Sequence, residues 1–352
     1  MNHRTSRVLL RSLIALLGLA LLVACGACSK KKSSPASSGG ASPSGPGATQ
    51  GLKQHLIALP VPVESEMVCV LDGAGIPKAL NQRLETMLYE EGGIMSGADK
   101  EEYEALKALG FTPDKLKRMV ICSLPGARGM GYMQFDFDAK VILDWASTIK
   151  DGPKPSFEID GNKVYADGDG TLWTVLDKNI LVVANDKQSL SVLLKTKKGE
   201  HASVLENPTM KPLLAAAPKG AAFHLIGTPP SGNGMSSLQI SGKLVPSMEI
   251  SGQLALETAL PPQIQPFVEN YESSKAMVAQ MVQSMLKQGG GQRGMSAELS
   301  EGYGAIVVDV ITTTSLKYDA GTKTVTFSSK PKTSLDTFMR VMALGRDFKK
   351  LL

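Results

Sequence analysis

Short segments with alternating apolar and polar residues are concentrated between residues 157 and 184. β-Branched and aromatic residues fill these segments, and clusters of Asp, Gly and Asn separate them. Alternation with a period of two is typical of strands with one buried face, and Asp-Gly pairs favour hairpin turns. We therefore predict an antiparallel meander whose strands cover residues 157–159, 163–166, 171–176 and 180–184.

Similar patterns predict strands and helices along the rest of the chain from about residue 55 onward. Apolar runs indicate strands, and apolar residues three and four positions apart indicate helices, with Asp138 and Asp186 as N-caps. Strands are predicted at residues 67–71, 118–124, 132–137, 221–227, 243–257, 303–312, 315–318 and 324–328. Helices are predicted at about residues 77–91, 101–109, 139–149, 187–194, 266–287 and 333–348, and loops at residues 126–131 and 229–237.

Two stretches of the chain, residues 178–195 and 323–340, match each other without gaps. Lys178 aligns with Lys323, and Leu190 aligns with Leu335, so we expect both leucines to be buried at equivalent helix positions. This match predicts an α+β fold of two similar modules of antiparallel sheet with packed helices, residues 53–200 and 201–352. Chance similarity between periodic patterns is the alternative. The arrangement resembles secreted bacterial proteins with duplicated α+β modules, a resemblance that implies no functional residues.

Residues 1–24 have the three-part pattern of a signal peptide. The basic start contains Arg4, Arg7 and Arg11. A mostly apolar run of 13 residues, 12–24, then ends directly before Cys25. This run is too short to cross a bilayer as a helix, which takes about 20 residues. Residues 22–25, Leu-Val-Ala-Cys, resemble the lipobox of bacterial lipoproteins.

The lipobox resemblance implies that the mature chain begins at Cys25 and carries fatty acyl chains such as palmitate there. The protein would then be a lipoprotein held at a membrane of the cell envelope. In such families an Asp after the cysteine favours the inner membrane, so Gly26 favours the outer membrane, facing the periplasm or the cell surface. The alternatives are a plain secretory signal with an unmodified Cys25, and lipidation at Cys28.

Residues 25–52 are expected to form a lipid-anchored flexible linker. Gly, Ser, Ala and Pro dominate this segment, which therefore cannot bury enough apolar surface to offset the entropy of ordering. Its only charged residues are Lys30, Lys31 and Lys32, and it contains no acidic residue. These lysines either contact anionic lipid headgroups or remain solvated in the linker.

The charge balance argues against nucleic acid as a partner. The chain has 38 Lys and Arg and 33 Asp and Glu, and loss of the three signal-peptide arginines leaves an excess of two positive charges. A nucleic-acid-binding domain normally carries a strong basic excess on one face. We therefore expect a membrane, reached through the N-terminal lipid, and a protein partner or an apolar ligand instead.

Two cysteines, Cys69 and Cys122, lie in predicted strands of the globular region. The cell envelope permits disulfides, and a bridge is feasible if the two strands are neighbours. Two buried thiols that pack as small apolar residues are an equally good interpretation. Neither cysteine has a nearby histidine or second cysteine, so we expect no metal at either position.

Known catalytic motifs do not occur in the chain. There is no nucleophile elbow, zinc-protease motif or phosphate-binding loop, and the Ser-x-x-Lys occurrences at Ser147 and Ser284 lack their partner motifs. The Asp-rich segment 167–171 fits a hairpin turn better than a calcium loop. Methionines recur on one predicted helix face at positions 277, 281 and 285, where buried packing is favoured over a Cu(I) site.

Three hypotheses for function follow. The first is a non-catalytic binding or structural protein of the envelope, with no catalytic residue, cofactor or metal. The second is a carrier or chaperone of a lipid-like ligand, enclosed by a curved sheet and methionine-rich helices. The third is an enzyme whose site has no recognised motif.

Overall fold

The computed structural model describes residues 50–76, 104, 107–110, 112–126, 128–148, 154–166, 170–228, 234–244, 248–263, 265–290 and 297–332. These residues form helices and twelve β-strands, and every pairing with a defined register is antiparallel. This content confirms the expected combination of helices with antiparallel sheet. The described residues divide into two compact units: unit 1 contains residues 50–75 and 104–241, and unit 2 contains residues 76 and 242–332.

Unit 1 contains nine strands in the order β9-β8-β1-β2-β3-β7-β6-β5-β4. The strands are β1 (Met67–Asp72), β2 (Leu116–Leu124), β3 (Arg128–Phe135), β4 (Lys154–Ile159), β5 (Asn162–Ala166), β6 (Leu172–Leu176), β7 (Ile180–Ala184), β8 (Phe223–Gly227) and β9 (Met235–Lys243). Strand β1 pairs with β2 on one side and with β8 on the other. The strand β8, which the sequence analysis placed in the second module, is therefore part of the unit 1 sheet.

The predicted meander is confirmed as strands β4 to β7, each paired with the next. Asp160 and Gly161 connect β4 to β5 with positive φ angles of 51° and 78°. Two consecutive positive φ angles are typical of the hairpin turns whose twist matches that of the flanking strands. Asp177 and Lys178 have φ angles of 50° and 62° between β6 and β7. The local sequence therefore specifies these turns well.

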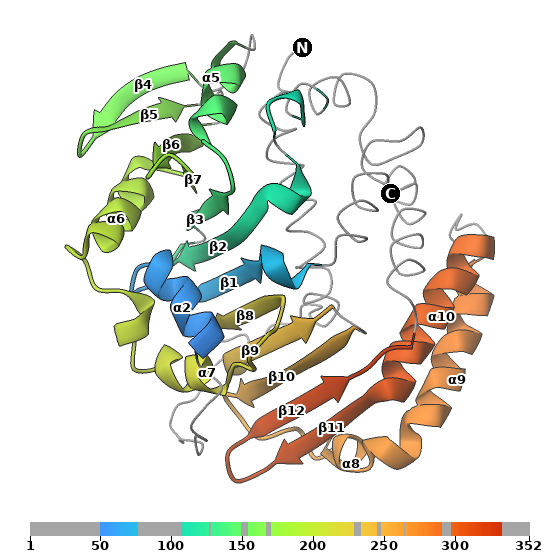
Figure 1. Cartoon of the computed structure of the whole chain (residues 1–352). Coiled ribbons are helices and arrows are strands. Elements are labelled where there is room, and N and C mark those ends of the chain that lie inside the picture. The colour runs from blue at the N-terminus through green and yellow to red at the C-terminus, as the bar shows by residue number, and fades with distance from the viewer. Residues whose placement is uncertain are drawn as a thin grey trace. The chain divides into compact units, whose positions relative to one another are not determined.

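Three helices cover one face of the unit 1 sheet: α2 (Gln50–Ala58), α6 (Lys187–Lys198) and α7 (Met210–Ala216) (Figure 1). Leucines from these helices pack against valines of β1, β2 and β7 in one apolar core. Leu190 in α6 has an exposed fraction of 0%, as expected. The Asp186 side chain accepts a hydrogen bond from the Ser189 N–H, which confirms the predicted N-cap of α6. Helix α5 (Lys140–Thr148) follows β3, and Asp138 accepts from the Lys140 N–H at its start.

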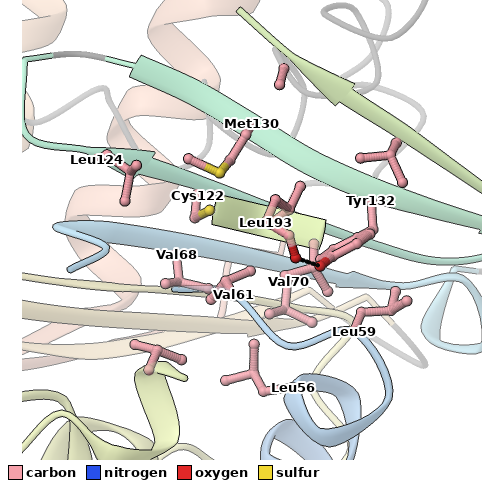
Figure 2. Close-up of a cluster of buried hydrophobic side chains, with 14 of the residues drawn as sticks. Leu56, Leu59, Val61, Val68, Val70, Cys122, Leu124, Met130, Tyr132 and Leu193 are labelled. Carbon is pink, nitrogen blue, oxygen red and sulfur yellow. Dashed lines mark hydrogen bonds between the residues drawn. The ribbon is translucent and has the colours of Figure 1, made fainter. Parts of the chain in front are cut away.

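Figure 2 shows the core of unit 1 around one aromatic residue, Tyr132. Tyr132 in β3 is fully buried, and its hydroxyl lies 3.0 Å from both the Pro60 carbonyl and the Leu193 carbonyl. The hydroxyl has one proton, so it donates to these two carbonyls in a shared contact. Tyr132 thereby joins the sheet, the segment after α2 and helix α6.

Unit 2 contains the strand order β11-β12-β10 and three helices. Its elements are β10 (Glu249–Leu256), α8 (Gln265–Glu269), α9 (Tyr271–Gly290), α10 (Ala297–Thr313), β11 (Thr314–Asp319) and β12 (Thr324–Ser329). Helices α9 and α10 pack against each other, and the Tyr271 hydroxyl donates to the Ile311 carbonyl. In the turn between β11 and β12, the Gly321 N–H donates to the Asp319 carboxylate.

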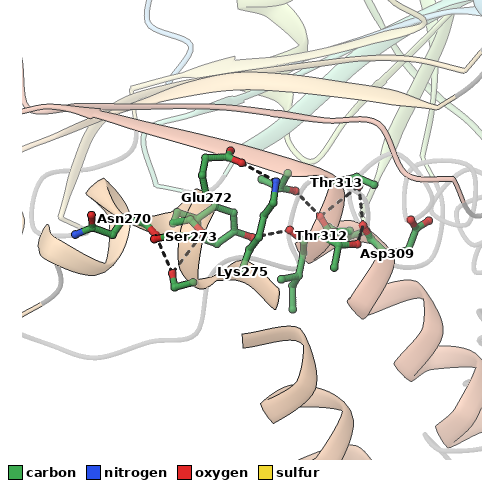
Figure 3. A network of polar contacts seen from close by, with 12 residues as sticks. Asn270, Glu272, Ser273, Lys275, Asp309, Thr312 and Thr313 are labelled. Carbon is green, nitrogen blue, oxygen red and sulfur yellow. Dashed lines mark hydrogen bonds and ion pairs between the residues drawn. The ribbon is translucent and has the colours of Figure 1, made fainter. Parts of the chain in front are cut away.

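The prediction of a strand at residues 303–312 is wrong, because these residues belong to helix α10. Their β-branched side chains favour strand locally, but Ile306 is buried in a helix that packs on α9. Threonine hydroxyls mark the end of α10: Thr312 bonds to the Val308 carbonyl and Thr313 to the Asp309 carbonyl (Figure 3). Tertiary packing therefore outweighs the intrinsic propensity of this segment.

Other boundaries differ from the predictions by a few residues. Strand β3 begins inside the glycine-rich segment predicted as a loop, and β9 begins inside the predicted loop 229–237. Helix α2 begins at Gln50 and buries Leu52, so the last residues of the predicted linker, 50–52, are helical. Short 3-10 turns are Gly73–Gly75, Pro113–Lys115 and Val204–Glu206. The helices predicted at residues 77–91 and 333–348, with Leu335, lie outside the described residues.

Candidate functional site

The proposed lipidation site, Cys25, lies outside the described residues, as do the neighbouring lysines 30–32. The signal peptide, lipobox and linker therefore stay predictions. Within the part of the chain that the structure describes, no helix is both long enough and apolar enough to span a membrane.

The disulfide considered for Cys69 and Cys122 is not formed. The two residues lie on paired strands, but Cys69 is opposite Ile121 and Cys122 is opposite Val68. A register offset of one residue places the two side chains on opposite faces of the sheet, where their sulfur atoms cannot meet. The interpretation as separate thiols is therefore the correct one. Cys122 is buried, and this burial raises the pKa of its thiol to about 12.

The sequence pattern favoured buried packing for the methionines of α9, and this prediction is wrong for Met277 and Met281. Met277 and Met281 have exposed fractions of 69% and 56%, while Ala279 on the other side of the helix is buried. The side chain of Met285 lies outside the described residues. Two exposed thioethers do not make a Cu(I) site, and no group of three or more His, Cys, Asp or Glu side chains suited to a metal gathers among the described residues.

Two of the scattered histidines, His55 and His224, come close together in a buried polar cluster of unit 1. His55 Nε2 lies 3.3 Å from the Asp72 carboxylate, and His224 Nδ1 lies 2.8 Å from the Ser241 hydroxyl. Burial, with the charge of His55, lowers the pKa of His224 to about 4. The hydrogen bond from His55 lowers the pKa of Asp72 below its ordinary value.

The polar cluster is built for a neutral His224. The Gln239 amide donates to the Ser241 hydroxyl at 2.7 Å, and the same hydroxyl is hydrogen-bonded to His224 Nδ1. Ser241 has an exposed fraction of only 1%. A serine next to a histidine base is a nucleophile arrangement in enzymes, but a substrate cannot reach Ser241 in this structure. The cluster therefore serves the packing of β8 and β9.

An open groove on unit 1 is the best candidate for a functional site. It has a volume of about 450 Å³, within the range of about 300–1,000 Å³ typical of ligand-binding clefts. We call it the α2 groove, because the end of α2 forms one wall and residues 196–206 form the other. Its apolar lining includes Leu56, Ile57, Pro60 and Leu205.

The walls of the α2 groove are held together by main-chain hydrogen bonds. The Val63 N–H donates to the Ala202 carbonyl at 3.0 Å, and the Val204 N–H donates to the Val61 carbonyl at 2.9 Å. Ser203 and Glu206 form a capping box at the start of the next turn. These contacts fix both walls relative to each other, so the groove is preformed.

The charged residues at the α2 groove are acidic. Glu200 and Glu206 line it, and among the described residues no lysine or arginine does. His201 Nε2 lies 2.9 Å from the carboxylate of Glu64, which is half-exposed at the same edge. The arrangement can therefore bind a group that is apolar on one side and cationic on the other.

Sequence reasoning missed the α2 groove, because its residues come from two segments about 140 positions apart that meet only in the fold. The folded structure marks the groove through Ile57, whose side chain is 60% exposed on a helix whose leucines are buried. A helical pattern alone cannot tell such an exposed apolar residue from a core residue.

No protein-family model, curated protein or solved structure matches this chain. Function therefore has to be inferred from the chain's own residues.

Proposed function

We propose that this protein is a lipid-anchored cell-envelope protein with a non-catalytic binding role, and that the α2 groove holds its partner. The observation that carries the binding role is a preformed groove with an apolar floor, an exposed Ile57 and an acidic edge. A cleft that combines apolar lining residues with a few charged groups is the usual setting of a binding site. The proposed role requires no cofactor or metal.

The anchor in this proposal rests on the N-terminal sequence. Lipid on Cys25 would be followed by 25 residues, 25–49, before α2 begins. A chain of this composition has an average end-to-end distance of about 25–30 Å. The linker would therefore allow unit 1 to meet a partner near an outer membrane, on its periplasmic or its exterior face.

An envelope carrier of a lipid-like ligand is the alternative role. A carrier would need an enclosed apolar cavity of several hundred Å³. The α2 groove has that size but is open and partly polar, and the core of unit 1 is filled by side chains. These features favour a partner that docks at the surface.

The proposal includes an internal repeat, with β1–α6 as one copy and the chain from β8 onward as the other. In each copy a strand leads to helical structure and then to antiparallel strands, the last of which pairs with the first strand: β7 pairs with β3 after α5 and three further strands, and β12 pairs with β10 after α8 to α10 and β11. The aligned Lys178 and Lys323 support the repeat, since both have positive φ angles, of 62° and 52°. Their carbonyls both accept main-chain hydrogen bonds, from the Ala139 N–H after the end of β3 and from the Leu256 N–H at the end of β10.

Lipid attachment can be tested with a fatty-acid analogue that is incorporated during growth. We expect the protein to be labelled, Cys25→Ser to lose the label and retain its signal peptide, and Cys28→Ser to behave like the unchanged protein. Full labelling of Cys25→Ser would contradict the anchor.

Binding in the α2 groove can be tested by placing a photo-crosslinking amino acid at Ile57 in cells. We expect a discrete crosslinked product from this position. The same amino acid at Glu158, an exposed residue of β4 that does not line the groove, should give none. Equal products from both positions, or no product from Ile57, would contradict a binding role for the groove.

A further inference from the structure

We infer that the α2 groove accepts a peptide segment in which a lysine or arginine stands next to large apolar residues. This inference rests on the proposed binding role and names the chemistry of the partner. It follows from the composition of the groove, from the way neighbouring cations are engaged, and from the exposure of one wall.

The apolar part of the partner is implied by the α2 side of the groove. Ile57 is 60% exposed and is the large exposed hydrophobic residue identified among the described residues of unit 1. Pro60 also lines the groove on this side, and Leu205 adds an apolar side chain from the opposite wall, while Leu56 is fully buried. Covering such a side chain removes apolar surface from water, at about 25 cal/mol for each Å².

The cationic part is implied by the opposite wall. The carboxylates of Glu200 and Glu206 line the groove, and that of Glu64 borders it through its contact with His201. Glu206 accepts from the Ser203 N–H at 3.1 Å through one of its two carboxylate oxygens. A lysine or arginine placed here gains charge-assisted hydrogen bonds.

The lysines closest in sequence do not neutralise this wall. Lys197 Nζ donates to the Ala58 carbonyl at 2.9 Å and lies 3.8 Å from Asp177. Lys198 lies 3.4 Å from the Asp160 carboxylate. Both ammonium groups are thus paired with acceptors other than Glu200 and Glu206, and these two carboxylates remain available for a cation from outside.

A peptide fits this groove better than a small ion does. The groove has both apolar and acidic lining residues, and its volume of about 450 Å³ gives room for more than one side chain. A bare cation would use only the acidic wall and would leave Ile57 exposed. A peptide with alternating cationic and apolar residues covers both walls at once.

The inference can be tested with the full-length protein in detergent and a fluorescent peptide, Gly-Leu-Lys-Leu-Lys-Leu-Gly, by fluorescence anisotropy. Two comparison peptides replace either the lysines by glutamate or the leucines by serine. We expect the parent peptide to bind at least tenfold more tightly than either comparison peptide. Equal binding of the glutamate peptide would overturn the cationic part of the inference, and equal binding of the serine peptide would overturn the apolar part.

Matched variants locate the binding. Glu200→Lys should weaken parent-peptide binding at least tenfold and Ile57→Ser at least fivefold, whereas Glu158→Lys, with the same change in net charge, should change it less than twofold. Glu200→Gln, at the same exposed position, provides a milder variant in case the reversal of charge disturbs folding. If all the groove variants bind the parent peptide as tightly as the unchanged protein, the inference is refuted. If Ile57 still crosslinks a partner in cells, the binding role stands and only the assigned peptide chemistry is wrong.

Discussion

His224 shows how the surroundings of one residue set its protonation. The imidazole lies in β8 beside Ser241, with His55 from α2 and Asp72 from β1 as the ionisable groups that affect it. Burial and the charge of His55 lower its pKa to about 4, whereas an exposed histidine in the unfolded chain has a pKa of about 6.5. The unfolded chain therefore binds a proton first as the pH falls.

We predict that the free energy of unfolding decreases as the pH falls from about 6.5 to 4, by at most about 3 kcal/mol from His224 alone. Urea unfolding at a series of pH values measures this change. His224→Gln cannot be protonated, so its unfolding free energy should depend less on pH in this interval. An unchanged pH dependence in that variant would show that other groups are responsible.

The thiols of Cys69 and Cys122 allow a second test at the same scale. Because their side chains point to opposite faces of the sheet, denatured but unreduced protein should show both thiols as reactive. In the folded protein Cys122 should react slowly, since it is buried and its high pKa leaves little thiolate. Mass spectrometry after alkylation counts the modified cysteines. If neither Cys69 nor Cys122 is alkylated in denatured, unreduced protein, the observed register is contradicted.

Among the elements, β3 has a connecting role that its sequence does not reveal. Tyr132 lies in the middle of this strand, and its hydroxyl reaches the chain after α2 and the backbone of α6 (Figure 2). Such contacts couple three segments that are far apart in sequence. The strand itself was predictable from its apolar residues, but its partners were not.

Tyr132→Phe should lower the free energy of unfolding by about 1–3 kcal/mol, because it leaves buried carbonyl groups without their hydroxyl partner. The ring and its packing remain. Tyr165→Phe, in β5 of the same sheet and with a buried side chain of its own, serves as the matched control and should have the smaller effect. Equal effects of the two changes would mean that the hydroxyl contacts of Tyr132 contribute little.

Elements with strong local signals were predictable, and elements defined by packing were not. Turn residues with positive φ fixed the meander, and Asp186 marked the start of α6, because these signals act over a few residues. Helix α10 was mistaken for a strand because its β-branched residues favour strands until α9 provides a packing surface. The α2 groove was not foreseeable, since its two walls come from distant segments.

At the scale of the whole molecule, the proposed internal repeat makes a prediction about two hairpin turns. Lys178 and Lys323 both have positive φ angles, which glycine adopts without strain. Lys178→Gly and Lys323→Gly should therefore each raise the stability by up to about 1 kcal/mol. Lys163→Gly, in the extended strand β5, should lower it by a similar amount.

Thermal unfolding of the three glycine variants provides the measurement. Stabilisation at both turns would agree with equivalent positions in two copies. Stabilisation at one turn and loss of stability at the other would count against the repeat.

The pairing of β1 with β8 has a consequence for how the chain is made. Strand β1 obtains its second row of hydrogen-bond partners from residues about 150 positions further along the chain. During synthesis or export from the N-terminus, one edge of β1 stays open until β8 has emerged. An open strand edge is a template for pairing with other chains. Incomplete or stalled chains that end before β8 are thus the form of this protein most prone to aggregate, and the form for which a chaperone would matter most.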